Sequence, residues 1–150
     1  MTMPKLKYFS ASEFGLWWPF MNRDLLLALD AFREEWGSPV QISPVNGTLG
    51  RILYANEDGF ESGHNLLRWG TVRAVDFFPR FEDGSYIATE AQRRRAYEIA
   101  INAGFEGIGL YTDTRPGNMM HGDMAGAGRR WARVPVAAGQ NPYVSINQVV

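Results

Sequence analysis

The 150-residue chain contains no cysteine and only two histidines, His64 and His121. The absence of cysteine excludes disulfides, thiolate–metal sites and a cysteine nucleophile. Any transition metal must therefore be held by histidine and carboxylate side chains. The 15 basic and 16 acidic residues leave a net charge of −1, which gives no electrostatic reason to expect nucleic acid or an anionic membrane as a partner.

Long apolar segments are also absent from the sequence. No run approaches the roughly 20 apolar residues of a membrane span, and residues 1–14 lack the apolar segment of a secretory signal peptide. We therefore expect a soluble protein made in the cytoplasm, which needs another release route to act outside it, and no membrane insertion. Hydrophobic residues make up 45% of the chain, enough for one domain with a substantial core.

Three helices are expected from capping signals and apolar spacing. A capping-box pattern at 10–13 predicts a short first helix that ends at Pro19. Apolar residues at helical spacing predict an amphipathic helix over 22–37, closed by a glycine. A second capping box and a final glycine predict another helix over 89–104.

The remaining patterns favour short strands joined by loops. The expected strands cover 39–43, 73–79, 105–112, 118–124 and 129–135. A polar, glycine-containing loop follows the first strand, and 134–150 is expected to be a loosely packed tail. This order predicts a single α+β domain over 1–150, with a core at about 8–133 and a small, mostly antiparallel sheet.

An acidic residue, Asp76, lies within the apolar strand segment 73–79. A buried carboxylate is costly unless a cation or several hydrogen bonds compensate it. His64 lies in the loop before this segment, and His121 lies in a later strand. Two imidazoles and one carboxylate form a common zinc set that leaves a fourth position for water. By itself, this pattern is equally compatible with histidines that have ordinary core or surface roles.

Four segments together resemble a known family of zinc peptidases. "SGH…GTVRAVDFF" and "GFEGIGLYTD…MMHGDM…RRW" are similar to the two signatures of the zinc D-Ala-D-Ala carboxypeptidases and L-alanyl-D-glutamate endopeptidases. "YFSASEFG…LLLALDAFREEWGSPVQIS" resembles the N-terminal part of these enzymes. The resemblance covers roughly residues 8–133, and its segments occur in the family's order.

The resemblance implies a hedgehog/D-Ala-D-Ala peptidase-like fold and hydrolysis of a peptide bond in bacterial peptidoglycan stem peptides. It makes His64, Asp76 and His121 the Zn²⁺ ligands and places Ser62 at the substrate site. It also assigns Arg51 to bind the substrate carbonyl or carboxylate, where a fixed cation stabilises an oxyanion. For Arg51 the ordinary alternative is a solvated loop charge.

The chain departs from the family pattern between its first two expected ligands. The step from His64 to Asp76 is 76 − 64 = 12 residues, longer than is usual in the family. Lengthening a loop costs little free energy, so the ligand strand tolerates an insertion that bulges outward. Trp69 lies in this loop, and it is a candidate for substrate contact or a packed aromatic without a role.

The general base is the second departure. Many relatives carry an acid three residues before the last histidine, where this chain has Asn118, which cannot accept a proton. Asp123 lies two residues after His121, on the same strand face, and is our first candidate for the base or for a group that orients a ligand. Asp113, at the end of the preceding strand, is the second candidate.

The resemblance and the missing signal peptide favour a monomeric phage or prophage lysis enzyme, or a virion-associated one, that acts on the cell wall. One alternative is a catalytically weak or inactive zinc-binding module of the same fold, serving as a phage structural or binding protein. The changes at Asn118 and after His64 favour this alternative. Another is a zinc amidase or peptidase with a different substrate.

Overall fold

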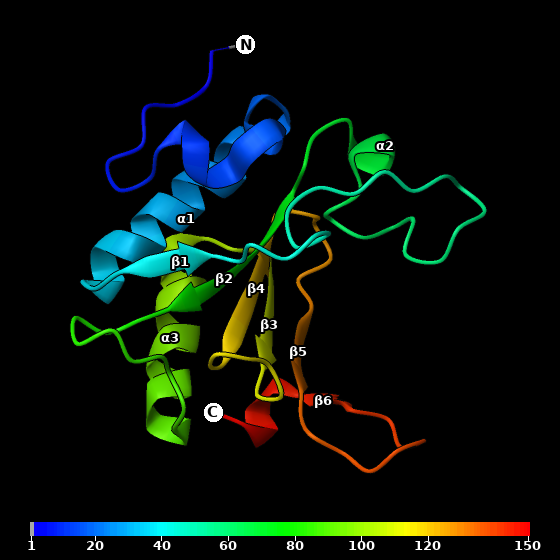
Figure 1. Cartoon of the computed structure of the whole chain (residues 1–150). Coiled ribbons are helices and arrows are strands. Elements are labelled where there is room, and N and C mark those ends of the chain that lie inside the picture. The colour runs from blue at the N-terminus through cyan, green and yellow to red at the C-terminus, as the bar shows by residue number, and fades with distance from the viewer. Residues whose placement is uncertain (1) are drawn as a thin grey trace.

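The computed structural model describes residues 2–150. It has an α+β fold in which two long helices pack on one face of a six-stranded mixed sheet (Figure 1). The helical elements are η1 (Ala11–Phe20), α1 (Arg23–Trp36), α2 (Leu66–Trp69), α3 (Glu90–Ala103) and η2 (Ile146–Gln148). The strands are β1 (Val40–Ile42), β2 (Ala74–Pro79), β3 (Gly107–Tyr111), β4 (Met119–Asp123), β5 (Arg130–Arg133) and β6 (Tyr143–Ser145).

The sheet runs in the order β1-β2-β4-β3-β5-β6. Only β3 and β5 pair in parallel, and every other neighbouring pair is antiparallel. The prediction of an α+β fold with a mostly antiparallel sheet is therefore confirmed. Within residues 2–150, no helix combines the length and apolar character that a membrane crossing requires.

The two long helices begin and end where the sequence predicts. The side chain of Asn22 accepts the backbone N–H of Leu25 and caps α1, which stops at Gly37 in the left-handed conformation (φ 79°). Thr89 caps α3 through a complete capping box. The first helix differs from the expectation, because η1 is a 3-10 element interrupted at Gly15.

Every residue of β2 is buried, although the strand carries an acid. Alternate side chains of a strand point to opposite faces. Phe77 therefore packs with Phe32 of α1, at a ring distance of 5.1 Å, while Asp76 points to the other face. That second face carries the site described below.

The C-terminal segment is not a loosely packed tail, so this prediction was wrong. Strand β6 pairs with β5, and the turn of η2 then carries Ile146 into the core with only 2% of its surface exposed. Val149 is also buried. A three-residue strand among polar residues is too short to give a periodic signal, so only the packing against β5 reveals its structure.

Candidate metal centre

Two neighbouring strands supply two of the three expected metal ligands. In the antiparallel register of β2 and β4, Asp76 lies directly opposite His121. Side chains of directly opposed residues point to the same face of the sheet, with their Cβ atoms roughly 5 Å apart. The pairing of these strands therefore brings an imidazole and a carboxylate together from positions 45 residues apart in the chain.

The third expected ligand, His64, comes from the loop between β1 and α2. The neighbouring Asn65 is fully buried, and its side-chain amide donates to the carbonyls of Leu53 and Phe60 while accepting the N–H of Leu53. The backbone N–H of Arg51 donates to the carbonyl of His64 over 2.8 Å. These bonds hold the loop in one shape and fix His64 beside the sheet, a role for Asn65 that the sequence did not reveal.

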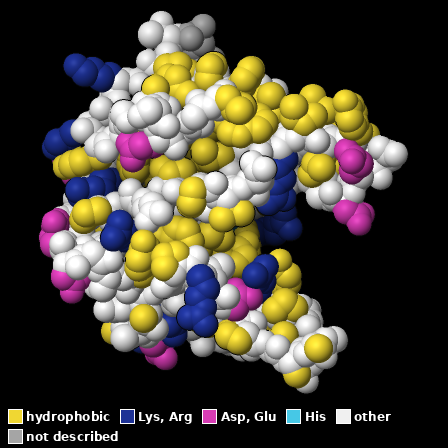
Figure 2. Space-filling view, in the orientation of Figure 1, with side chains coloured by type: hydrophobic (Ala, Val, Ile, Leu, Met, Phe, Trp, Pro, Cys, Tyr) yellow, Lys and Arg dark blue, Asp and Glu magenta, His cyan; other side chains and the backbone are white. Residues whose placement is uncertain are grey.

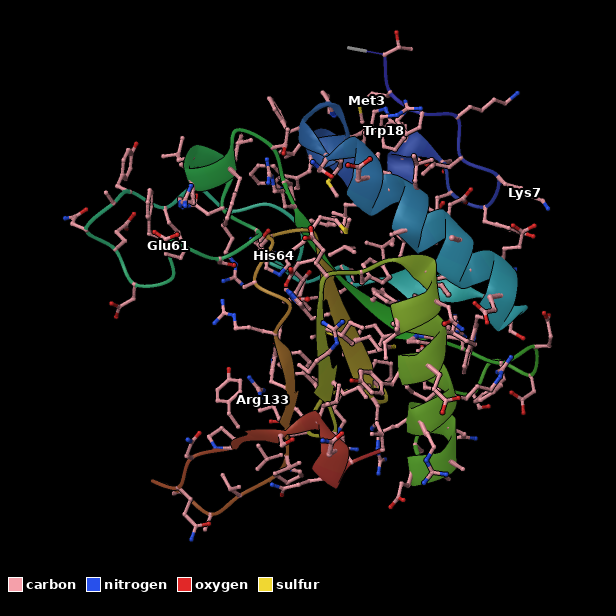
Figure 3. All side chains as sticks on the ribbon, turned by 180° about the vertical axis from the view of Figure 1, so that it is seen from behind. Met3, Lys7, Trp18, Glu61, His64 and Arg133 are labelled. Carbon is pink, nitrogen blue, oxygen red and sulfur yellow. The ribbon has the colours of Figure 1, made fainter. Side chains whose placement is uncertain are left out.

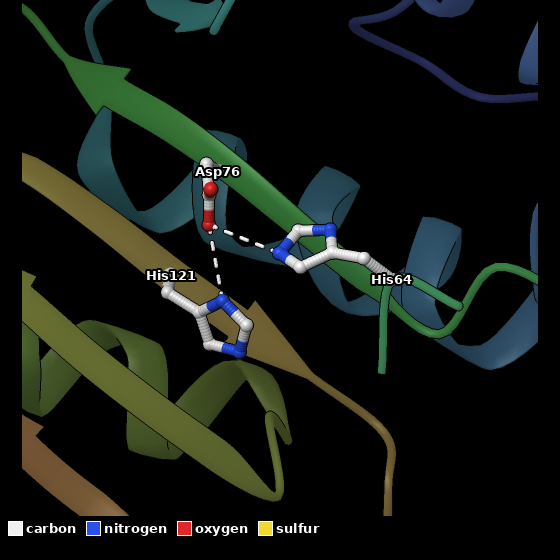
Figure 4. A group of neighbouring side chains, drawn as sticks. All are labelled: His64, Asp76 and His121. Carbon is white, nitrogen blue, oxygen red and sulfur yellow. Dashed lines mark hydrogen bonds and ion pairs between the residues drawn. The ribbon is translucent and has the colours of Figure 1, made fainter. Parts of the chain in front are cut away.

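The three side chains form a compact buried group (Figure 4). Asp76 Oδ1 lies 3.0 Å from His121 Nδ1 and 3.5 Å from His64 Nε2. One potential ligand atom from each residue lies within 4.8 Å of the others. Ligand atoms around a tetrahedral zinc ion, each about 2.0–2.2 Å from the metal, would be spaced about 3.3 Å apart. The group can therefore hold a metal ion.

Each histidine donates its other ring N–H to an oxygen outside this group. His64 Nδ1 donates to the carbonyl of Leu49 over 2.6 Å, and His121 Nε2 donates to Asp123 Oδ2 over 2.7 Å. Partners of this kind orient the imidazole and select the tautomer that a metal needs. When His121 is neutral and keeps this hydrogen bond, its Nδ1 carries a lone pair on the side of Asp76, as does His64 Nε2 in the tautomer that donates to Leu49, so both nitrogens can then bind a metal.

The carboxylates in and beside the group favour a positive charge there. Burial opposes charge on His121, but hydrogen bonds with Asp123 and Asp76 outweigh it and raise the His121 pKa to about 9. Burial alone would raise the pKa of Asp76, yet the hydrogen bond from His121 and the nearby imidazole of His64 hold that pKa far below its usual range. Without a bound metal, His121 is therefore protonated at neutral pH, and its positive charge offsets part of the negative charge of Asp76 and Asp123.

The group of His64, Asp76 and His121, called the metal group below, opens into a pocket of about 700 Å³. The loop that carries Glu61 projects on one side of the opening and the chain after β5 projects on the other, so the molecule is visibly notched there (Figure 2). Figure 3 shows His64 close to the sheet, with Glu61 further out on the projecting loop and Arg133 below it in this view. A ligand in this notch would therefore reach the metal group from solvent.

Arg51 and Ser62, both predicted to contact substrate, line the pocket. Arg51 Nε donates to the carbonyl of Gly47 over 2.7 Å, which fixes the guanidinium on the loop wall. Ser62 Oγ accepts the backbone N–H of His64 over 3.2 Å, so this hydroxyl also stabilises the turn that carries a ligand. The structure thus brings both residues to the expected site.

Trp69, in contrast, does not line the pocket as expected of a substrate contact. Its indole N–H donates to the carbonyl of Ser62 over 3.0 Å. Its ring contacts two guanidinium groups, whose central carbons lie 4.3 Å (Arg68) and 4.9 Å (Arg73) from the ring centre. Trp69 therefore braces the turn that leads to His64.

The structure places the two candidates for a general base in different surroundings. Asp113 forms an ion pair with Arg133 over 2.8 Å and lines a separate hollow, away from the metal group. Asp123 does line the pocket, but both of its oxygens are engaged, Oδ2 with His121 and Oδ1 with the backbone N–H of Ala125. Its geometry is that of a group that orients His121, the second of the two roles expected for it.

Asn118, at the position where many relatives of the resembled family carry an acid, faces away from the site. It precedes β4 by one residue, and strand alternation puts it on the opposite face from His121. There its amide oxygen accepts a hydrogen bond from Arg93 Nη1 of α3 over 3.2 Å. Asn118 therefore links a helix to the sheet and does not take part in the site.

The face of β3 that borders the site carries residues that the sequence did not assign to the site. Gly107, Gly109 and Tyr111 alternate along the site face of β3. A Cβ at Gly107 would overlap the Asp123 carboxylate, and one at Gly109 would lie 2.6 Å from the Trp131 ring. The glycines of "GFEGIGLY" therefore make room for these two side chains. In the sequence, the spacing of these glycines and Tyr111 at every second position was the pattern that could have indicated this arrangement.

The fold and the site together define an α+β protein with a buried group of two histidines and one aspartate that can hold a metal ion. Comparisons with protein-family models, with curated proteins and with solved structures give no match to this chain. What the protein does is therefore inferred from the site and from its sequence motifs.

Proposed function

We propose that the protein is a zinc-dependent peptidase that hydrolyses a peptide bond in bacterial peptidoglycan stem peptides. We place this activity in phage or prophage lysis, or in wall degradation by a virion. The observation that carries the proposal is the His64–Asp76–His121 group, whose ligand atoms are spaced for a metal at the base of an open pocket. The resemblance to the zinc D-Ala-D-Ala peptidase family supports the choice of substrate.

The donor set favours zinc among the common metals. Two neutral imidazoles and a carboxylate are a frequent catalytic zinc set, whereas Mg²⁺ and Ca²⁺ prefer oxygen ligands. When bound, zinc supplies a Lewis acid and activates a water molecule near neutral pH. Asp123 and the Leu49 carbonyl would hold the two imidazoles in the orientation that binding requires.

Arg51 is the residue best suited to bind the reacting part of the substrate. Its guanidinium lines the pocket, and the Gly47 carbonyl fixes one of its nitrogens. Within residues 2–150 no group bonds its other two nitrogens, which are available for a substrate oxygen. A fixed cation stabilises the negative charge that develops on the carbonyl oxygen during hydrolysis, and it does so without reorganising.

A second candidate function is a zinc-binding module with weak or no catalysis. The observation that favours it is that both oxygens of Asp123 are engaged, while Asp113 and Asn118 lie outside the pocket. Glu61 is the other carboxylate near the opening, and it is exposed and paired with Arg68 over 2.7 Å. The two candidates differ in turnover and share the same metal site.

Metal analysis of the purified protein, combined with mass spectrometry of muropeptides released from peptidoglycan, separates these candidates. We expect one zinc per chain and cleavage at a single type of peptide bond. His121→Ala should lose both, whereas the control Asp113→Asn should keep both because it lies outside the site. Zinc without cleavage would support the inactive module. Absence of zinc affinity would contradict both candidates.

A further inference from the structure

The side chain of Tyr111 lines the metal pocket from the last position of β3. The register of the sheet sets Gly109 opposite His121, so Tyr111 lies on the same face, one alternation further along the strand. Trp131 contacts both His121 and Tyr111, and its ring lies 4.8 Å from that of His121. Tyr111 is thus positioned beside the metal group without being part of it.

The phenol of Tyr111 is held in place but has an unused donor. Trp131 Nε1 donates a hydrogen bond to Tyr111 Oη over 3.2 Å. Because an indole N–H can only donate, the phenol oxygen is the acceptor and its own proton must point elsewhere. Among residues 2–150, no side chain or backbone group accepts a hydrogen bond from that O–H. The O–H lines a pocket that is open to solvent, so it can donate to a ligand that enters there.

The surroundings keep Tyr111 in the form that can donate. Burial raises the pKa of Tyr111 to about 12, so the phenol stays protonated across the physiological range. The guanidinium of Arg133 lies 5.3 Å from the ring centre and packs against the ring face. With Trp131 on its oxygen and Arg133 on its ring, the side chain is fixed before a ligand arrives.

Taking the proposed peptidase function as its basis, we propose that Tyr111 is a substrate-binding residue. Its O–H donates a hydrogen bond to an oxygen of the peptide that occupies the pocket beside the metal. The acceptor is either a backbone carbonyl or a free carboxylate of that peptide. Tyr111 would thereby position the peptide on the sheet side of the pocket, while Arg51 holds it from the loop side.

The test compares wild type with Tyr111→Phe, which keeps the ring and removes only the donor. The control is Tyr86→Phe, which also removes a hydroxyl hydrogen bond, to Gln41 over 2.9 Å, at a place outside the pocket. Both zinc-loaded variants are assayed for hydrolysis and binding of a synthetic stem pentapeptide. For Tyr111→Phe we expect peptide affinity and kcat/KM to fall roughly threefold to tenfold with a neutral carbonyl as the acceptor, and by more with a carboxylate. Zinc affinity should not change, and Tyr86→Phe should keep wild-type kinetics.

A readout independent of turnover is the indole N–H resonance of Trp131, assigned with Trp131→Phe. Because this N–H donates to Tyr111 Oη, a ligand that accepts from the phenol should shift the resonance. We expect the pentapeptide to shift it in wild-type protein and to shift it much less in Tyr111→Phe. Repeating the titration with the C-terminal amide of the peptide distinguishes the acceptors, since only a carboxylate acceptor would lose the shift.

The possible outcomes separate this inference from the proposed function. Cleavage that is unaffected by Tyr111→Phe, with no shift of the Trp131 resonance, would overturn the role of Tyr111 and leave the peptidase proposal standing. Binding that is weakened in Tyr111→Phe, without cleavage in any variant, would support the role of Tyr111 and overturn the peptidase proposal. A wild-type protein that neither binds nor cleaves the peptide would overturn both.

Discussion

The affinity of the protein for Zn²⁺ should depend strongly on pH between 7 and 9, because a proton and the metal compete for His121. In the metal-free site His121 lies between the carboxylates of Asp76 and Asp123, 3.0 and 2.7 Å away, and its pKa is raised to about 9. Metal binding requires the neutral imidazole, so the proton must leave first.

The size of the effect follows from the distance between the pH and this pKa. Each pH unit below the pKa costs about 1.4 kcal/mol, or tenfold in affinity. At pH 7 the protonated His121 should therefore weaken zinc binding about 100-fold relative to pH values above 9, equivalent to roughly 2.7 kcal/mol. A histidine with the ordinary pKa of about 6.5 would give almost constant affinity over the same range.

The measurement is competition for zinc against a chromophoric chelator of known pH dependence, at several pH values from 6.5 to 9.5. We expect the dissociation constant to fall about tenfold per pH unit between 7 and 9 and then to level off. Calorimetry at pH 7 in buffers of different ionisation enthalpy should show release of about one proton per zinc from His121. An affinity that is constant from pH 7 to 9 would refute this account of the site.

Asp123→Asn supplies the control for this experiment. It removes one of the two carboxylates that raise the His121 pKa, so the pH at which affinity levels off should move down. It also weakens the orientation of His121, so the plateau affinity itself should fall roughly 10- to 100-fold. A levelling-off pH that does not move would mean that Asp123 does not interact with His121 as described.

Three further predictions concern stability. Gly109→Ala would place a Cβ against the Trp131 ring and should cost roughly 1–3 kcal/mol of unfolding free energy in denaturant titrations, and a neutral result would mean that the ring is free to move aside. Ile146→Ala should cost roughly 2–5 kcal/mol in the same assay, because it empties a core position, whereas a loosely packed tail would lose almost nothing. Asn65→Ala should leave the partly buried carbonyl of Phe60 without this donor and cost roughly 1–3 kcal/mol of unfolding free energy. It should also speed proteolysis of the loop over 52–61, and unchanged cleavage there would contradict the role of Asn65.

The helices show how much of the fold could be predicted from local sequence. Helix α1 begins at Asn22 and ends at Gly37 because a side-chain cap and a left-handed glycine act within one turn of the chain. Strand β2 was recognisable from its apolar run. Strand β6 was not, because its order depends on pairing with β5 and on burial of Ile146, which are contacts between distant parts of the fold.

The residue types suggested the candidate metal ligands, and the family resemblance assigned them. A chain with two histidines, no cysteine and an aspartate in an apolar strand leaves few ways to build a metal site, and the structure brings His64, Asp76 and His121 together. The family resemblance added the expected roles of Arg51 and Ser62, and both residues line the pocket. Zinc binding and catalysis remain proposals for the experiments above.

What the sequence determined by itself was the set of residue types and the local elements: the capped helices, the apolar strands and the donors that a metal would need. The tertiary structure decided which atom of each residue does what. Asp123 and Asp113 are both aspartates next to a strand end, yet one accepts from His121 and the other pairs with Arg133 in a separate hollow. Sheet register and alternation decide between such roles, because they set which face a side chain occupies and which distant group lies within hydrogen-bonding distance.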